Sequence, residues 1–403
     1  MSDRQAQATG QVTRALFYCD ANLNLIDGSS MFVVSMCQVL SALGVQTTVV
    51  LRAVVESSVV LGDIERLSGI HLVRAVEQGL ATGPLLTPDD AAGVLTELDA
   101  ANRFDLVIVR SRPTAVRLAE SGLFDNRLWV YPLDIPQRAA DITDDVRTQM
   151  SVISASSQLL LVQTPQFLEY LVEYFPSTAD KSYLWHPVVP NIDFPLPPRP
   201  LGGPAVRLGY MGKYAREWNT MAMTTLPALF AARGIDAEVH MVGDKVGRDP
   251  RDRDYIGAMR AALQGTPGVV WHGGVSRRES MQIAAGMDFG LAWRAAEMDT
   301  SPELQTKLLE FAVLRVPPLL RRTPLHEDVM GPDYPFFVST PESVVDVVVE
   351  ALGDPSVIDR AAERCRQVTV DFGFTHSLEV MAGLLNREIP GWQAASGWHG
   401  QPG

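Results

Sequence analysis

A positive side chain and two carboxylates lie close together within residues 300–320, which read TSPELQTKLLEFAVLRVPPLL. Lys307 lies between Glu303 and Glu310, which are 7 positions apart. On a helix both carboxylates would face one side, with the lysine one turn from each. A helix start with a nearby cation attracts anions, and a deeper carboxylate accepts hydrogen bonds from hydroxyl groups. The pattern indicates a site for a phosphorylated, hydroxyl-rich ligand, whereas ordinary charge pairs on an amphipathic helix are the simpler interpretation.

The residues around these side chains predict the elements that position them. Ser301 and Pro302 are of the types that commonly begin a helix. Apolar residues then recur at helical spacing and predict one buried face, which comprises Leu304, Leu308, Leu309 and Ala312. Residues 316–320 predict the start of a short buried strand. The three charged side chains should therefore project from one helix that packs on a sheet.

Two further cations follow a predicted strand at residues 206–211. Lys213 and Arg216 lie in the loop after this strand, within the run GYMGKYAREWN. Open α/β sheets bind ligands at the carboxyl ends of their strands. The pair therefore predicts contact with an anion, and two solvated surface cations are the alternative. Arg294 ends another predicted strand, at residues 289–293, and could anchor a phosphate or a second substrate.

The first strand–loop–helix segment contains a glycine between polar residues. Asp27, Gly28 and Ser29 precede a helix predicted at 31–43. Glycine permits close approach of the backbone, a serine can cap the helix, and a helix start favours an anion. A plain capped turn would have the same composition. No GxGxxG motif occurs, so a dinucleotide fingerprint is absent.

Composition places the chain among globular proteins. It has 403 residues, 46% of them hydrophobic, which predicts two or three domains. The net charge of −13 argues against nucleic acid as a partner. Three widely spaced cysteines fit a reducing compartment and exclude a cysteine zinc site. With no signal peptide and no long apolar run, we expect a cytoplasmic protein without a transmembrane segment, for which peripheral membrane contact stays open. The Ala/Arg/Val-rich composition favours a GC-rich bacterial genome.

Predicted strands and helices alternate along the whole chain, and the predictions include a helix near 220–233 and a short strand at 336–338. Such alternation indicates parallel, doubly wound sheets. Residues 187–204 contain seven prolines and read as a semi-rigid linker between two halves. We expect a disordered tail at 1–12, a first domain at 13–187, the linker at 188–204, a second domain at 205–375, a final helix at 376–392 and a tail at 393–403.

The run TKLLEFA at 306–312, followed by Val316-Pro317, resembles the nucleotide-sugar motif of the family-four retaining glycosyltransferases. That family has two glutamates separated by seven residues and then a Gly-x-Pro turn. Glu310 matches the second glutamate, Pro302 occupies the position of the first, and Glu303 is one residue closer. Arg315 stands where the family usually has glycine. The resemblance implies the GT-B fold, an α/β fold in which two Rossmann-like domains face each other across a cleft, and a last helix that crosses back to the first domain.

The resemblance also implies roles for individual residues. Glu310 would bind the ribose, Lys213 the diphosphate, and the turn at 273–275 the nucleotide base. The donor-binding residues so implied are Asp27, Gly28, Ser29, Gly212, Gly274, Val275, Arg294, Thr306, Leu308 and Glu310. The catalytic set comprises Lys213, Arg216, Lys307 and Glu303. The three cations would stabilise the departing diphosphate, and Glu303 would contact the donor sugar in place of the family's first glutamate. We interpret His272 as a structural residue rather than a general base.

The acceptor would lie on the first domain. The residues that follow its strands include Asp20, Asn22, Arg110 and Arg112. Two arginines could recognise an acidic acceptor, and surface salt bridges explain them equally well. Asp252 and Asp254 match the Asp-x-Asp motif of metal-dependent glycosyltransferases. We reject them as metal ligands because they lie in the charged run GRDPRDRD, and we expect neither a metal nor any other cofactor.

The sequence thus predicts a retaining, metal-independent glycosyltransferase of hexosyl type. Its donor would be a nucleoside-diphosphate sugar, with UDP favoured, and its acceptor a small-molecule, natural-product, glycan or lipid-linked hydroxyl. A sugar-nucleotide 2-epimerase of the same fold and a non-catalytic sugar-nucleotide-binding module are the alternatives. Sugar, base, acceptor and the choice between monomer and homodimer are left open.

Overall fold

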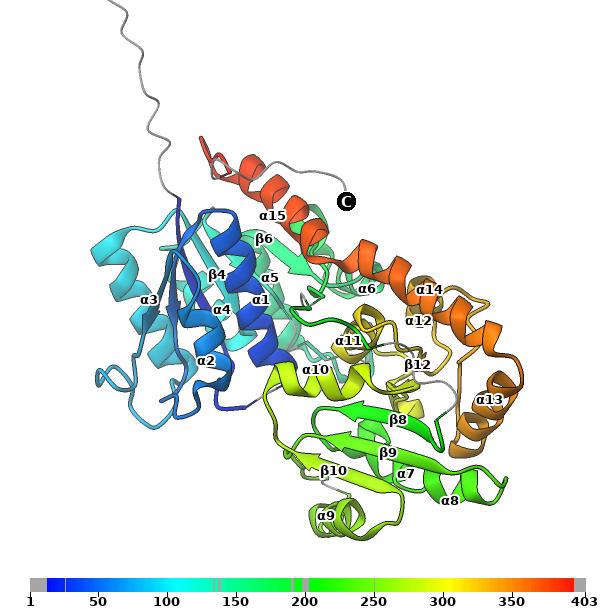
Figure 1. Ribbon diagram of the computed structural model, residues 1–403. Coiled ribbons are helices and arrows are strands. Elements are labelled where there is room, and N and C mark those ends of the chain that lie inside the picture. The colour runs from blue at the N-terminus through cyan, green and yellow to red at the C-terminus, as the bar shows by residue number, and fades with distance from the viewer. Residues whose placement is uncertain are drawn as a thin grey trace, which may run out of the picture. The chain divides into compact units, whose positions relative to one another are not determined.

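The chain divides into two compact units (Figure 1). The computed structural model describes residues 13–25, 27–132, 135–136, 139–189, 192–197, 203–249 and 251–394. The first unit comprises residues 1–186 and 374–403, and the second residues 187–373. The predicted tail at 1–12, most of that at 393–403 and parts of the linker lie outside the described residues.

Within the described residues, the first unit contains a sheet of seven parallel strands in the order β3-β2-β1-β4-β5-β6-β7. Their bounds are β1 Arg14–Cys19, β2 Gln46–Val50, β3 Ile70–Val73, β4 Leu106–Arg110, β5 Leu128–Val130, β6 Ser157–Val162 and β7 Ser182–Leu184. The sheet grows in one direction from β1 to β3 and in the other from β4 onward. Cys19 and Arg110 are paired where the direction changes. Loops diverge at such a switch point and leave room for a ligand.

Helices cover both faces of this sheet. They are α1 Gly28–Ala42, α2 Ser58–Glu65, α3 Pro88–Asn102, α4 Arg112–Ser121, α5 Asp144–Ser156, α6 Pro165–Tyr174 and α15 Phe374–Glu388. α1 packs beside α2 and α15, whereas α3, α4 and α5 pack in a second row (Figure 1). Because both faces are covered, residues 106–109 of β4 are completely buried.

The second unit has a smaller parallel sheet, in which the described strands are ordered β10-β9-β8-β11-β12. They are β8 Val206–Met211, β9 Ala237–Val242, β10 Val269–Gly273, β11 Phe289–Leu291 and β12 Pro318–Leu319. The helices are α7 Thr220–Met223, α8 Leu226–Ala231, α9 Tyr255–Gly265, α10 Arg277–Ala285, α11 Thr306–Val313, α12 Pro324–Met330, α13 Pro341–Gly353 and α14 Pro355–Phe372. Its switch point lies between β8 and β11, so the loops after these two strands are the natural ligand-binding segments.

One hydrophobic core supports the second unit. Val189 is part of this core, and Ile192, Phe194 and Leu196 pack against it, so the described part of the proline-rich stretch packs on this unit. Phe311 of α11 lies against Gly290 of β11, where a Cβ atom would come within 2.4 Å of the ring. Glycine at 290 therefore lets α11 sit close to the sheet.

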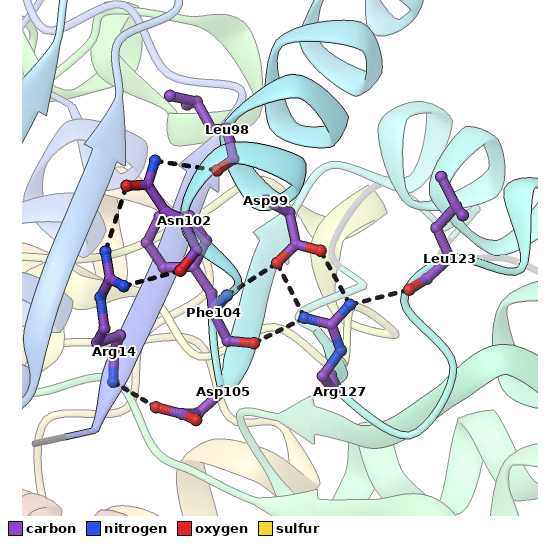
Figure 2. A network of polar contacts seen from close by, with 8 residues as sticks. All are labelled: Arg14, Leu98, Asp99, Asn102, Phe104, Asp105, Leu123 and Arg127. Atoms are coloured by element: carbon purple, nitrogen blue, oxygen red, sulfur yellow. Dashed lines mark hydrogen bonds and ion pairs between the residues drawn. The ribbon is translucent and has the colours of Figure 1, made fainter. Parts of the chain in front are cut away.

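A polar network lies at the amino ends of strands β1, β4 and β5 in the first sheet (Figure 2). Arg127 makes two hydrogen bonds of 2.9 Å to the carboxylate of Asp99 and donates to the carbonyl of Phe104. Arg14 donates to Asn102 at the end of α3. Burial raises the pKa of Asp99, but the hydrogen bonds from Arg127 and Phe104 outweigh it and lower the pKa overall. The network therefore ties α3 to three strands and needs an ionised Asp99.

The alternation predicted from the sequence is confirmed, with shifts of a few residues at most ends. Four helices were missed: α2, α5, α9 and α12. A helix predicted at 220–233 is divided into α7 and α8. Residues 336–338 make an isolated bridge, between Leu320 and Phe337, rather than a strand. None of the helices in the described parts of the chain has the length and apolar character needed to cross a bilayer.

Arg315 has a backbone conformation that normally requires glycine. It follows α11 with a φ of +58°. The N–H of Val316 donates to the carbonyl of Phe311, and that of Arg315 to Ala312. These two bonds form a Schellman motif, in which the left-handed position is usually glycine. A non-glycine residue there costs about 1–2 kcal/mol.

We expect Arg315→Gly to stabilise the protein by about 1 kcal/mol, because glycine adopts this conformation without strain. Arg315→Ala is the matched control, since it removes the same side chain but keeps the strain. Urea denaturation of the two variants measures the difference between them. If Arg315→Gly is no more stable than Arg315→Ala, the strain assigned to this turn is absent.

Candidate functional site

Two glycines bring together the carboxyl ends of β8 and β9. Gly212 follows β8 with a φ of +121°, and Gly243 follows β9 with a φ of +132°. A Cβ atom on Gly243 would lie 2.3 Å from the carbonyl oxygen of Gly212. The loops after β8 and β11 meet at the same edge, since the N–H of Ala295 donates to the carbonyl of Glu217 at 2.9 Å. The candidate site is built around these loops.

The helix that carries Glu310 begins later than the sequence predicts. α11 starts at Thr306, whereas Ser301 was the predicted start. Residues 301–305 are irregular, and the hydroxyl of Ser301 accepts a hydrogen bond from the N–H of Glu303 at 3.3 Å. This serine closes a local turn instead of capping a helix. Glu303 therefore does not share a helical face with Glu310, and the predicted two-turn alignment is wrong.

A buried amide and an imidazole fix the start of α11. Nε2 of Gln305 donates to the carbonyl of Ala292 at 2.8 Å and lies 3.3 Å from Nε2 of His326. Nδ1 of His326 lies 2.7 Å from the carbonyl of Arg321, so Nδ1 carries the proton and Nε2 accepts. Burial lowers the pKa of His326 to about 4. The neutral ring thus supports the helix start.

Lys307 is enclosed by two aromatic rings and a stretch of backbone. Its Nζ lies 4.5 Å from the centre of the Trp218 ring and 5.2 Å from that of Tyr210. A Cβ atom on Gly212 would come within 3.2 Å of Cε of Lys307. The ammonium group therefore lies over π-electrons at the edge of the sheet, an attractive contact.

The charge of Lys307 depends on pH near neutrality. Burial lowers its pKa to about 8, Glu310 opposes this shift, and repulsion from Arg294 and Lys213 adds to it. The ammonium form therefore prevails at pH 7 and is lost as the pH rises through about 8.

Arg294 is a second cation of this cluster and is only 4% exposed. Its guanidinium donates to the carbonyl of Glu303 at 3.4 Å, and its Cζ lies 5.9 Å from the Trp218 ring centre. Burial lowers its pKa to about 10, although Glu303 and Asp299 oppose the shift. The site thus holds a buried positive charge at neutral pH.

Glu310 faces Arg277 of α10, with 3.8 Å between Oε1 and Nη2. Both side chains are mostly buried. Burial raises the pKa of Glu310 overall, although Arg277 and Lys307 oppose this shift. A separation of 3.8 Å is longer than a hydrogen bond, so the pair is held by charge alone. The carboxylate can therefore accept hydrogen bonds from hydroxyl groups of a ligand.

The predicted pair of cations after β8 is divided between two environments. Lys213 lies beside Gly247, where a Cβ atom would come within 2.7 Å of its Cε, and it contributes to the repulsion on Lys307. Arg216 is exposed and pairs with the buried Asp249 at 3.6 Å. Lys213 therefore belongs to the Lys307 cluster, whereas Arg216 faces an acidic residue of the same unit.

Gly274 and Val275 lie in the turn between β10 and α10. A Cβ atom on Gly274 would come within 2.6 Å of the carboxylate of Asp244, so Asp244 occupies the space beside it. His272 lies at an irregularity in the β9–β10 pairing, with its Nε2 3.0 Å from Nδ1 of His240. Burial and His240 lower the pKa of His272. His272 is therefore within hydrogen-bond distance of His240, a residue of the adjacent strand.

In the first unit, the pairing of β1 with β4 brings Arg110, which was predicted to bind the acceptor, close to Ser29, which was predicted to bind the donor. Asp27 caps α1 by accepting from the N–H of Ser29 at 3.1 Å. The hydroxyl of Ser29 accepts from Arg110 at 3.1 Å, and the Arg110 guanidinium lies 5.0 Å from the centre of the Phe32 ring. Gly28 is the first residue of α1, and a Cβ atom there would meet nothing within 4 Å.

The other predicted residues of the first unit make contacts inside it. Asp20 pairs with Arg52 at 2.5 Å. The side-chain oxygen of Asn22 accepts two bonds of 3.0 Å from the residue two positions later. Arg112 donates to Gln149. Of these contacts only that between Asp20 and Arg52 is a salt bridge, whereas the partner of Arg112 is a neutral amide.

Asp252 and Asp254 stabilise a turn before α9. Oδ1 of Asp252 accepts from the N–H of Asp254 at 3.0 Å, and both side chains are exposed.

Four residues that contact the site were not predicted from the sequence: Tyr210, Trp218, Arg277 and Gln305. Tyr210 and Trp218 flank the two predicted cations in the GYMGKYAREWN run. Aromatic residues beside cations at a strand end were the available signal.

Comparisons with known proteins identify the fold. No family model and no curated protein matches the sequence. Sucrose-phosphate synthase from Thermosynechococcus elongatus is similar in structure, with a TM-score of 0.68, 15% identity and coverage of 94% of this chain and 99% of that one. Anabaena HepE in complex with UDP and glucose has a TM-score of 0.69, 12% identity and coverage of 93% and 99%. A Rickettsia africae glycosyltransferase has a TM-score of 0.68, 11% identity and coverage of 94% and 99%. The chain has the α/β fold of the GT-B glycosyltransferases.

Proposed function

We propose that the protein is a retaining glycosyltransferase that uses a nucleoside-diphosphate sugar, most simply a UDP-sugar, without a bound metal ion. One observation carries the proposal: Lys213 and Arg294 lie close enough to Lys307 to repel it at the switch point of the second sheet. Lys307 itself lies on α11, one helical turn before Glu310. Three positive charges beside a carboxylate suit a ligand that has a diphosphate next to a ribose. Structures of this fold solved with UDP support the choice of ligand.

In this proposal the cations bind the diphosphate. Lys307 and Lys213 contact its oxygens together with the N–H of Thr306 at the start of α11. The N–H of Leu308 already donates to the carbonyl of Gln305 at 3.2 Å. Because Lys307 is already partly removed from water, its charge acts strongly on a bound anion. Arg216 would join only by exchanging Asp249 for a phosphate oxygen.

Glu310 would accept hydrogen bonds from the two ribose hydroxyls. Arg277 favours the ionised carboxylate, although burial raises its pKa overall, and Arg277 does not occupy its oxygens at hydrogen-bond distance. The base would lie near the turn at Gly274 and Val275. Glu303 lies in the irregular segment before α11 and would contact the sugar from there.

The reaction itself is a substitution at the anomeric carbon. The bond from this carbon to the phosphate oxygen breaks, and its electron pair stays on the diphosphate, where the cations stabilise the growing charge. The acceptor hydroxyl forms the new bond on the same face and passes its proton to the departing phosphate oxygen. Configuration is thereby retained without a nucleophilic carboxylate.

The acceptor would bind to the first unit. Arg110 with Ser29 at the switch point of its sheet suits an acceptor that carries an acidic group or several hydroxyls. Small molecules, natural products, glycans and lipid-linked sugars share these features.

Glu310→Gln should weaken UDP binding about tenfold, because charge-assisted hydrogen bonds to the ribose become neutral ones. Isothermal calorimetry measures the effect, and Glu350→Gln, an exposed change in the same unit, is the control. Equal UDP affinity in the Glu310→Gln variant and the native protein would remove the ribose assignment.

Release of UDP from UDP-sugars should survive treatment with EDTA, because Lys307, Lys213 and Arg294 supply the positive charge. Coupled detection of UDP with a panel of UDP-sugars, with and without chelator, makes the measurement. Loss of turnover that magnesium restores would contradict metal independence. Formation of a 2-epimer without UDP release would favour the epimerase.

A further inference from the structure

Trp218 lies against two cations of the candidate site. Lys307 Nζ is 4.5 Å from the centre of its ring, and Cζ of Arg294 is 5.9 Å away. The two cations come from different segments, α11 and the loop after β11, whereas Trp218 comes from the loop after β8. The indole of Trp218 therefore contacts one cation from α11 and one from the loop after β11.

Hydrogen bonds of the backbone hold this indole in place. The N–H of Trp218 donates to the carbonyl of Ala215 at 3.1 Å. Next to it, the carbonyl of Glu217 accepts from the N–H of Ala295 at 2.9 Å, which joins the loops after β8 and β11. Asn219 closes the turn in a left-handed conformation, with a φ of +54°. The backbone that carries the ring is thus fixed by contacts within the second unit.

The surroundings of Lys307 mostly disfavour its charge. Arg294 and Lys213 repel it, and burial removes water. Glu310 is the attractive charge, but it also faces Arg277. The faces of Trp218 and Tyr210 add attraction for the ammonium form alone, since a neutral amine gains little from the ring quadrupole.

We infer that Trp218 is a positioning residue that keeps Lys307 protonated and directed toward the edge of the second sheet, where it meets the anionic part of the donor. The ligand named here rests on the proposed function, but the effect on Lys307 does not. Without the indole, repulsion from Lys213 and Arg294 would make Lys307 neutral at a lower pH. Binding of a diphosphate would then fail at a lower pH too.

The titration of Lys307 in the ligand-free protein tests this inference. Competitive acetylation at a series of pH values, read by mass spectrometry of the peptide that contains Lys307, reports the protonation midpoint. Trp218→Leu keeps an apolar side chain against the ammonium but removes the ring. We expect the midpoint to fall by about one pH unit in this variant.

Two further variants keep the result interpretable. Trp218→Phe retains a ring with a weaker quadrupole, so its midpoint should fall by less, and it decides the question alone if Trp218→Leu does not fold. Phe337→Leu is the matched control, because it removes a ring 4.4 Å from Arg322 elsewhere in the same unit. Its Lys307 midpoint should equal that of the native protein. An unchanged or raised midpoint in the Trp218 variants overturns the inference.

A second readout uses UDP itself. The loss of UDP affinity on raising the pH should begin about one unit lower in Trp218→Leu than in the native protein, with similar affinities at pH 6. An identical pH dependence in both proteins contradicts the role of Trp218. If the native protein binds no UDP, the proposed function fails, while the acetylation midpoints still decide the inference about Lys307.

Discussion

The candidate site depends on a lysine ammonium group held away from water against aromatic faces. Burial and two neighbouring cations weaken the charge of Lys307, and Glu310, Tyr210 and Trp218 sustain it. A charge in this balance interacts strongly with an arriving anion, because little water screens it. It also titrates close to physiological pH. The proposed binding of a diphosphate depends on these opposing effects on the charge of Lys307 more than on any single sequence motif.

The fold supplies the geometry that this balance requires. The loops after β8 and β11 leave the second sheet at its switch point and are joined by a backbone hydrogen bond, and α11 brings Lys307 to the same place. Close approach is possible because Gly212, Gly243 and Gly290 leave room where any side chain would collide. The buried pair Gln305 and His326 then fixes the helix start. Each of these contacts lies within the second unit.

Much of this arrangement was predictable from local patterns. Alternating strands and helices indicated two parallel sheets, and the spacing of Lys307 and Glu310 placed both on one helix. The true start of α11 was not predictable, because Ser301 and Pro302 look like a helix start but belong to a local turn. Trp218 and Arg277 were missed because their partners are distant in sequence. Similarly, the contact of Arg110 with Ser29 depends on the register of β1 and β4.

A crystal structure of the protein with UDP, grown without divalent metal, would show directly what binds the diphosphate. We expect diphosphate oxygens within hydrogen-bond distance of Nζ of Lys307, and both ribose hydroxyls on the carboxylate of Glu310. We also expect Trp218 to keep its place against the lysine. A diphosphate bound away from Lys307, or one held through a metal ion at Asp252 and Asp254, would contradict the proposed binding.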